Sequence, residues 1–284
     1  RIAFDGTNSL IVWSEFTSST DSDVFGRRVS QAGMLLEAAP FAISSAAGRQ
    51  DSPDVDFDGT QFVTVWNEAL AMPYTMTGAR ISSAGVVLDA TGVPLGTARF
   101  SAELTFAGGQ HFIAWVDTRA GSARVYGDLL DGSLVSSSAG VGVALVFVPA
   151  TQVTPSVSFD GTNHLVTWAD NRHGQTSIYG SRISRAGGLL DPTGFRISAA
   201  DAGAVVEPAS AFNGTHHLVV WYATGGLVAR RVSPSGTIVD ATDLRLSSEC
   251  CDARVASNGS DFLVVWHGTA FDIHGVRVSA AGVL

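Results

Sequence analysis

The chain has 284 residues, of which 45% are hydrophobic and only 15% charged. This composition excludes a disordered chain, because disorder needs low hydrophobicity and high charge. It also excludes a membrane-spanning helix, since the longest nearly unbroken apolar run, residues 139–150, is interrupted by Gly and Pro and is shorter than the roughly 20 residues that a span needs.

The charge balance is acidic, with a net charge of −9, and all 17 basic residues are Arg. These arginines are scattered along the chain rather than clustered. A protein that binds nucleic acid is expected to carry basic clusters that neutralise phosphates. The sequence therefore predicts no nucleic-acid partner.

A repeat of about 45–53 residues runs along the whole sequence. Its first half is a turn followed by an apolar stretch that ends in Trp, as in SLIVW, FVTVW, HFIAW, HLVTW, HLVVW and FLVVW. Five of the turns contain Asp-Gly or Asn-Gly, and the third contains Gly108-Gly109 instead. Asx-Gly pairs favour a two-residue type I′ hairpin, so we expect strand A, a type I′ turn and strand B.

The second half of the repeat carries a Gly-x-Arg-Val/Ile-Ser signature or a variant of it, a Gly turn and a short apolar run. It predicts strand C, a turn and strand D, and four antiparallel strands per repeat are typical of a propeller blade. We therefore predict an all-β, six-bladed β-propeller that forms one domain over residues 1–284. The predicted blades are approximately residues 1–50, 51–100, 101–152, 153–204, 205–250 and 251–284. An open solenoid and two separate domains are the alternatives; solenoid repeats are usually shorter, and no linker interrupts the period.

The sixth repeat ends where its strand D would begin. Either blade six is incomplete, or the native protein is longer, or another chain pairs with this edge. An unpaired strand edge favours such pairing, which would be a self-association through the incomplete blade.

Repeats reading F-D-G-T, then V-x-W, then Y-G-x-R-I-S, of which residues 159–191 fit best, resemble those of large secreted or cell-surface bacterial propeller-repeat proteins. The resemblance covers nearly all of the chain. It implies a propeller fold and a secreted or cell-surface location, and it brings no defined activity with it.

The loops between strands B and C vary in length, and function tends to lie on variable loops of a rigid scaffold. These loops share one face with the D–A connections, and we expect the ligand-binding residues among the carboxylates, arginines and aromatics of this loop face, which suit a glycan or a protein partner. The candidates are Asp117, Arg119, Tyr126, Asp170, Arg172, His173, Tyr179 and Tyr222. The alternative is that the two Asp/Arg pairs brace their own loops.

Other candidates are few. Asp21 and Asp23 could bind Ca²⁺, and no other cofactor is predicted. The His residues four positions before three of the tryptophans (His111, His164, His217) favour aromatic packing over a metal site. The repeated strand-C Arg (Arg28, Arg80, Arg182, Arg231, Arg277) favours a structural role, stacking on Trp or pairing with a turn carboxylate, over a repeated ligand site. Cys250 and Cys251 are either joined by a vicinal disulfide or present as two separate thiols.

No G-x-S-x-G, HExxH or P-loop motif is present. We therefore expect an extracytoplasmic, non-catalytic binding or scaffold module. One alternative is a propeller glycosidase or lyase with carboxylates near a central channel. Another is a surface or matrix protein that assembles through its open blade edge.

Overall fold

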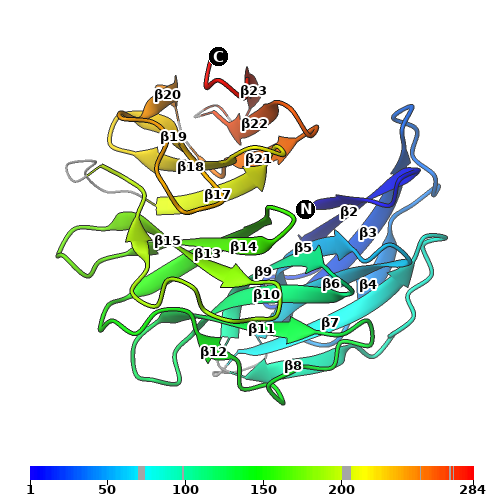
Figure 1. The fold of residues 1–284 in the computed structure, drawn as a ribbon. Coiled ribbons are helices and arrows are strands. Elements are labelled where there is room, and N and C mark those ends of the chain that lie inside the picture. Colours follow the sequence, from blue (N-terminus) through cyan, green and yellow to red (C-terminus); the bar gives the residue numbers. More distant parts are fainter. Residues whose placement is uncertain (70–73, 98, 200–205, 250, 269, 271) are drawn as a thin grey trace. The chain divides into compact units, whose positions relative to one another are not determined.

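The computed structural model describes residues 1–69, 74–97, 99–199, 206–249, 251–268, 270 and 272–284 (Figure 1). Within these residues it contains 23 strands and no helix, which confirms the predicted all-β class. The described part of the chain accordingly has no helix that could cross a membrane.

The strands fall into six consecutive groups, one for each sequence repeat, which we call blades one to six. Blades one and two are β1 (Ile2–Phe4), β2 (Asn8–Phe16), β3 (Ser22–Ser30), β4 (Phe41–Ser44), β5 (Arg49–Phe57), β6 (Gln61–Ala69), β7 (Thr75–Ser82) and β8 (Val93–Thr97). Blades three and four are β9 (Arg99–Ala107), β10 (Gln110–Asp117), β11 (Arg124–Leu130), β12 (Val143–Ala144), β13 (Gln152–Phe159), β14 (Asn163–Asp170), β15 (Ser177–Ser184) and β16 (Phe195–Arg196). Blades five and six are β17 (Val206–Phe212), β18 (His217–Ala223), β19 (Gly226–Val232), β20 (Leu244–Ser247), β21 (Arg254–Ser257), β22 (Phe262–His267) and β23 (Ile273–Val278).

Neighbouring strands within a blade pair in antiparallel fashion, for example β2 with β3, β6 with β7, β14 with β15, β18 with β19 and β22 with β23. Blades one and two are joined into one sheet by a single parallel bridge between Ser22 and Arg49. Blades three, four and five are separate four-stranded sheets, and blade six has three strands in the described residues.

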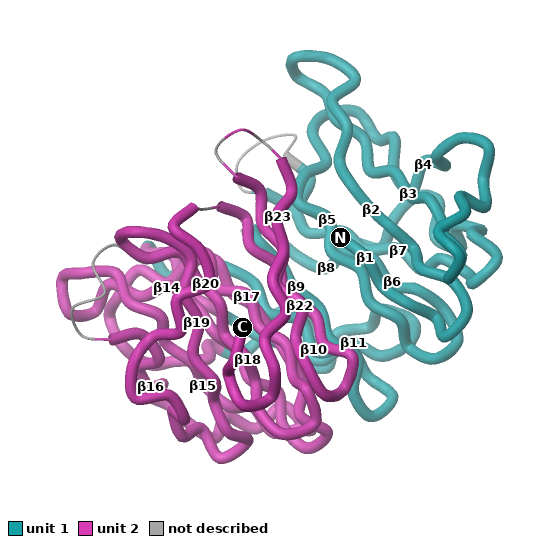
Figure 2. Tube along the Cα trace, turned by 90° about the horizontal axis from the view of Figure 1, so that it is seen from above, with its two compact units in different colours: residues 1–121, 126–143 teal, residues 122–125, 144–284 magenta. Residues whose placement is uncertain are grey.

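The chain forms two compact units (Figure 2). The first comprises residues 1–121 and 126–143, and the second comprises residues 122–125 and 144–284. The boundary between them crosses β11 of blade three, so the repeat pattern and the division into units do not coincide.

Strand B of each of blades two to five is buried on both faces, as its sequence predicts. In β6, Phe62 and Trp66 belong to the core cluster shared with blade one, whereas Val63 and Val65 belong to the cluster shared with blade three. All four side chains are at most 1% exposed. Because side chains alternate along a strand, an apolar residue is needed at every position of a strand that lies between two sheets.

The predicted turn type between strands A and B is wrong for five of the six blades. In blade four the turn residues are Gly161 and Thr162, because Asp160 N donates to Asn163 O at 3.0 Å. Only Gly161 has a positive φ, which is the type II′ pattern, and the Asp160 carboxylate accepts from the amides of Thr162 and Asn163. The Asx side chain caps the turn instead of entering it. Blade three, which lacks Asp, is the one with two positive φ angles, at Gly108 and Gly109.

A second backbone feature recurs in blades two to six and has no obvious single-residue sequence signal. Five residues before the end of strand A, or six in blade three, a non-glycine residue has a φ between 47° and 56°. These residues are Ser52, Ser101, Thr154, Glu207 and Asp252. In blades two, four and five the register of strand A shifts at this point and a proline follows, as in Thr154-Pro155. Proline cannot donate to the ladder, so the bulge interrupts the pairing where strand A begins.

Candidate functional site

The first group of predicted site residues lies in blade three and forms a closed polar cluster. Asp117 is fully buried and accepts hydrogen bonds from Trp115 Nε1 at 3.2 Å and from Arg119 Nε at 2.7 Å. Arg119 lies over the ring of Tyr126 at 4.8 Å, and Tyr126 also stacks on Trp115, with 6.1 Å between the ring centroids. Burial alone would raise the pKa of Asp117, but the hydrogen bonds from Arg119 and Trp115 outweigh it and lower that pKa.

Blade four repeats this arrangement almost atom for atom. Asp170 accepts from Trp168 Nε1 at 3.0 Å and from Arg172 Nη2 at 2.6 Å. Arg172 is only 10% exposed and lies 3.9 Å above the ring of Tyr179. In both blades the arginine therefore pairs with the carboxylate two residues before it, which favours the alternative interpretation that the two Asp/Arg pairs brace their own loops.

The remaining predicted residues are more loosely placed. His173 is exposed, and its ring centroid lies 6.5 Å from that of Tyr179, so it is the outermost residue of the blade-four cluster. Tyr222 is half-buried on β18 of blade five, opposite Leu227, with no polar or ring contact in the described residues. Its role in binding stays a prediction.

The stacking of Trp on strand C extends to blades that the prediction did not include. Trp13 stacks on Phe25 at 6.2 Å, and Trp266 stacks on His274 at 5.8 Å. The indole nitrogen of Trp13 also donates to Glu15 at 3.2 Å. The indoles of Trp13, Trp115 and Trp168 each donate to a carboxylate two residues later. The Trp-x-Asp/Glu pattern is not a sufficient signal, because Trp66 is followed by Glu68 at the same spacing and its indole N–H has no hydrogen-bond partner in the described residues.

The predicted calcium ligands lie together at the start of β3. Burial, with the neighbouring Asp21 carboxylate, raises the pKa of Asp23. Two carboxylates supply few of the six to eight oxygens that Ca²⁺ takes. The described part of the chain contains no group of three or more His, Cys, Asp or Glu side chains that could hold a metal ion. Of the predicted cysteine pair, Cys251 is disulfide-bonded, and Cys250 lies outside the described residues.

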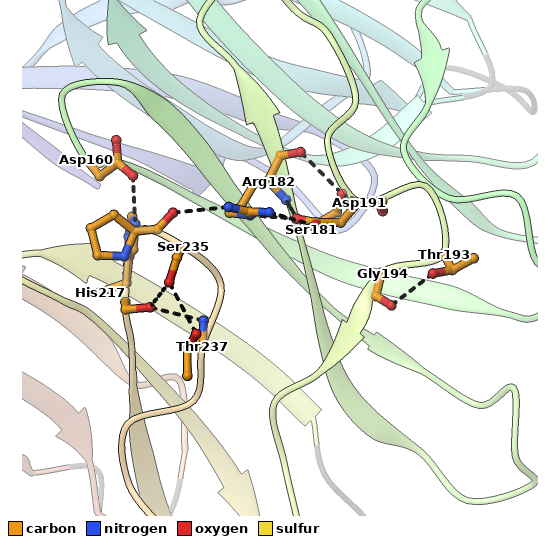
Figure 3. A network of polar contacts seen from close by, with 11 residues as sticks. Asp160, Ser181, Arg182, Asp191, Thr193, Gly194, His217, Ser235 and Thr237 are labelled. Atoms are coloured by element: carbon orange, nitrogen blue, oxygen red, sulfur yellow. Dashed lines mark hydrogen bonds and ion pairs between the residues drawn. The ribbon is translucent and has the colours of Figure 1, made fainter.

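The repeated strand-C arginine has the structural role that the sequence predicts. In blade four, Arg182 pairs with Asp191, which follows it in the next turn (Figure 3). Arg182 Nη1 also donates to Pro234 O of blade five. The same pairing joins Arg28 to Glu37, Arg80 to Asp89 and Arg231 to Asp240. Arg277 of blade six differs, because it is 75% exposed and pairs with Asp261 of the preceding turn.

The three equivalent histidines pack on aromatic rings, as predicted. His111, His164 and His217 are at most 2% exposed, and each lies about 5 Å from a Phe of strand A in its own blade. Burial lowers the pKa of each imidazole to about 4. His217 also hydrogen-bonds through Nδ1 to Ser158 Oγ of blade four at 2.8 Å.

Sequence reasoning did not find the cluster of charges on the A strands of the first unit. Arg1 lies between Asp54, at 3.5 Å, and Glu103, at 2.6 Å. Asp54 and the nearby Asp56 also accept the backbone amides of Leu104 and Phe106 on β9. Burial raises the pKa of Asp54, and it raises that of Asp56 to about 6. Asp54 and Glu103 occupy equivalent positions of their repeats, and Asp56 lies two residues after Asp54. This correspondence was the available sequence signal for the cluster.

Comparison with known proteins shows the fold and no family. No protein-family model and no curated protein matches the chain. The structure is similar to an α-L-arabinanase of Penicillium chrysogenum solved with arabinobiose, with a TM-score of 0.65 and 9% identity over 98% of this chain and 91% of that one. It is also similar to an N10 neuraminidase-like protein of a bat influenza A virus, with a TM-score of 0.58 and 10% identity over 97% and 93% of the two chains.

A prolyl endopeptidase gives a TM-score of 0.58 and 12% identity over 99% of this chain but only 40% of its own. The architecture is therefore that of β-propeller proteins. Because identities this low show only the fold, they assign no reaction to the chain.

Proposed function

We propose that the chain is a six-bladed β-propeller that acts outside the cytoplasm as a non-catalytic binding or scaffold module, and that its B–C loop face recognises a protein. Six consecutive repeats with their own strand sets support the blade number. The disulfide-bonded Cys251 supports an oxidising compartment, where such bonds persist.

We choose a protein over a glycan as the ligand because arginine side chains cover the tyrosine rings of the candidate residues. A sugar ring stacks on an open aromatic face, but Arg172 lies over Tyr179, which is 5% exposed, and Tyr126 contacts both Arg119 and Trp115. Arg119 pairs with Asp117 and Arg172 pairs with Asp170, and the pKa of each of these two carboxyls is lowered, whereas a general acid needs a raised pKa. In blade four, His173 stays exposed beside a loop that the Asp170–Arg172 pair holds, and a pre-organised loop of this kind suits protein recognition.

The test places a photo-crosslinking residue at either end of β14, at His173 on the loop face or at Thr162 in the opposite turn. Both side chains are exposed, so neither replacement disturbs the core. We expect one discrete crosslinked protein from a cell-surface extract with the His173 probe, competed by unlabelled chain, and none with the Thr162 probe. Equal crosslinking at both positions would contradict the proposal.

A glycan array, probed with calcium and again with chelator, tests the other ligand class. We expect no selective glycan binding in either arm. Selective binding would replace the protein partner with a glycan, and its loss with chelator would assign Asp21 and Asp23 to a calcium site.

One observation favours a glycosidase as the second candidate, namely that Arg1 brings the carboxylates of Asp54 and Glu103 together on neighbouring A strands. Glycoside hydrolysis uses two such carboxylates. Hydrolysis of arabinan or xylan by the purified chain, abolished in Asp54→Asn and in Glu103→Gln, would support this candidate. No hydrolysis, or hydrolysis that both variants retain, would exclude these carboxylates as the catalytic pair.

A further inference from the structure

Cys251 stands directly opposite His267, the last residue of β22, just before β21 begins. Cys251 N donates to His267 O at 3.0 Å, and His267 N donates to Cys251 O at 3.3 Å. Two residues that exchange both hydrogen bonds in an antiparallel pair have their side chains on the same face, with about 4.5–5.5 Å between the Cβ atoms. The Cys251 sulfur therefore belongs next to the His267 imidazole, and both residues lie in the second compact unit.

The contacts of the His267 ring require a positive charge. Nδ1 lies 3.2 Å from Gly268 O, and Nε2 lies 3.1 Å from a carboxylate oxygen of Asp252. A carbonyl and an ionised carboxylate only accept hydrogen bonds, so both ring nitrogens must donate, and an imidazole with two N–H groups is the cation. The hydrogen bond to Gly268 O and that to Asp252 accordingly raise the pKa of His267.

This cation stands beside a disulfide sulfur. Cys251 is disulfide-bonded, and the sequence contains one other cysteine, at position 250. Reduction of a disulfide releases thiols, and a neighbouring imidazolium stabilises a cysteine as its thiolate. A thiol that ionises readily leaves faster in thiol–disulfide exchange, and stabilising the reduced form makes the disulfide a stronger oxidant. His267 therefore favours departure of the Cys251 sulfur as a thiolate.

We propose that the disulfide of Cys250 and Cys251 is a redox-active site for dithiols, in which His267 stabilises Cys251 as the leaving thiolate. A thiolate of the dithiol attacks the Cys250 sulfur, forms a mixed disulfide with it and releases the Cys251 thiolate. The second thiol of the dithiol then attacks this mixed disulfide, so that the reductant leaves as a disulfide and carries away no sulfur of the chain.

The exchange passes two electrons from the dithiol to the chain. Of the two protons that the dithiol loses, one ends on the Cys250 sulfur and the other in solvent, because Cys251 stays ionised. The reverse sequence of steps reoxidises the pair. The site lies in blade six, whereas the proposed protein-binding residue His173 lies in blade four, so each proposal can fail without the other.

The first experiment tests the bond and its reduction in the folded chain. Trypsin cleaves after Arg245 and Arg254, which gives a peptide of residues 246–254 with both cysteines. Mass spectrometry of a non-reduced digest should find this peptide lighter by two hydrogen atoms than its reduced form. Dithiothreitol added to the folded chain, followed by alkylation and digestion, should give the doubly alkylated peptide. Two free thiols in the untreated chain, or a bond that dithiothreitol leaves intact, would overturn the proposal.

Two single-cysteine variants separate the two sulfurs. Cys250→Ser leaves Cys251 as the thiol, and Cys251→Ser leaves Cys250. The rate of alkylation by iodoacetamide is measured against pH for both, with glutathione as the reference thiol. Because Cys251 is the residue opposite His267, its alkylation should have its midpoint at least about one pH unit below that of glutathione and below that of Cys251→Ser. Equal midpoints for the two variants would contradict the role of Cys251.

Substitution of the histidine tests the stabilising group. His267→Gln retains a side chain that forms hydrogen bonds but removes the positive charge. Combined with Cys250→Ser, it should raise the alkylation midpoint by about one pH unit. In the chain with both cysteines it should make reduction by dithiothreitol about tenfold less favourable, which corresponds to about 30 mV for a two-electron couple. A purely structural role of His267 would change the melting temperature but neither of these quantities.

His274→Gln is the matched control. His274 is the other histidine of blade six, but in the ladder it stands opposite Trp266, on which its ring stacks. Its Nε2 lies 2.9 Å from Asp272 and 3.4 Å from Glu249. The control should keep the alkylation rate and the redox equilibrium within about twofold of the unsubstituted values. Equal effects of the two histidine substitutions, or no effect of His267→Gln, would overturn the assignment of His267.

Discussion

Arg182 and Asp191 form a bidentate ion pair across the turn that joins strands C and D of blade four, with both N–O distances at 2.9 Å (Figure 3). Because Arg182 also donates to Pro234 O, one side chain ties its own turn to the next blade. We expect Arg182→Met to lower the free energy of unfolding by about 1.5–3 kcal/mol, the range for hydrogen bonds to charged groups. Urea unfolding monitored by Trp fluorescence measures the loss.

Arg277→Met is the matched control for Arg182→Met. Arg277 occupies the equivalent position in blade six, but its pair with Asp261 has one 2.9 Å contact and the side chain is 75% exposed. Exposed pairs of this kind contribute about 0–1 kcal/mol, so the control should lose less than Arg182→Met. Equal losses for the two variants would show that the contact between blades contributes nothing.

The buried carboxylate of Asp56 should make stability depend on pH in the opposite direction to most acids. Its pKa in the folded chain is about 6, mainly because of burial, so its contribution is full below pH 3.8 and is lost as the pH rises through 6. Asp56→Asn removes this loss. Its free energy of unfolding relative to the unsubstituted chain should increase from pH 4 to pH 7, by up to about 3 kcal/mol at 1.36 kcal/mol per pKa unit.

Asp191→Asn should change the pH dependence of the free energy of unfolding in the opposite direction. The hydrogen bonds from Arg182 hold the pKa of Asp191 below its ordinary value of 3.8 despite partial burial. The stability from this group is therefore present above pH 3.8 and is lost as the pH falls below it. Urea unfolding of both variants across pH 3–7 should give differences of opposite slope, and parallel curves for the two would contradict the assignment.

Much of the fold could be predicted because it depends on repeated, local patterns. The tryptophans fixed the period, and the strand-C arginines such as Arg182 gave a structural interpretation that the ion pairs confirm. The turn type could not be predicted from Asp-Gly alone, because the choice depends on whether Asp160 enters the turn or caps it with its side chain. The positive φ at Thr154 likewise requires knowledge of where the ladder breaks.

The candidate site was predicted as a set of residues but not as an arrangement. Arg172, Asp170 and Tyr179 were expected on one face, and they lie together. That the guanidinium covers the ring, and so removes a stacking surface for a sugar, depends on side-chain conformations that no spacing reveals.

The buried histidines predict a difference between two equivalent positions. Neither ring nitrogen of His111 has a hydrogen-bond partner in the described residues, whereas His217 bonds to Ser158. Blades two and six have Phe62 and Phe262 at this position, so the site accepts a phenyl ring. We expect His111→Phe to raise the free energy of unfolding at pH 7 by about 1 kcal/mol, because a buried polar atom without a partner costs about 1–3 kcal/mol.

His217→Phe should stabilise less at pH 7, because it leaves Ser158 Oγ without that partner. The free energy of unfolding of both variants, relative to that of the unsubstituted chain, should increase as the pH falls from 6.5 towards 4. The folded pKa of each histidine is about 4, so the stability that depends on the neutral ring is lost over this interval. Thermal unfolding at pH 7 and pH 5 measures both effects, and a larger gain for His217→Phe than for His111→Phe at pH 7 would contradict the contact difference.

The bracing of the loop face can be tested at Asp170. This carboxylate is 1% exposed and accepts hydrogen bonds from Trp168 Nε1, from the backbone amide of Arg172 and from its guanidinium. Asp170→Ala leaves Arg172 without its counter-ion and Trp168 without its acceptor, so we expect a loss of about 3 kcal/mol in the free energy of unfolding. His173→Ala, three residues further on and exposed, is the control and should change stability by less than about 0.5 kcal/mol. If Asp170→Ala unfolds at the same urea concentration as the unsubstituted chain, the carboxylate does not brace the loop, and its burial would instead reflect a ligand-binding role.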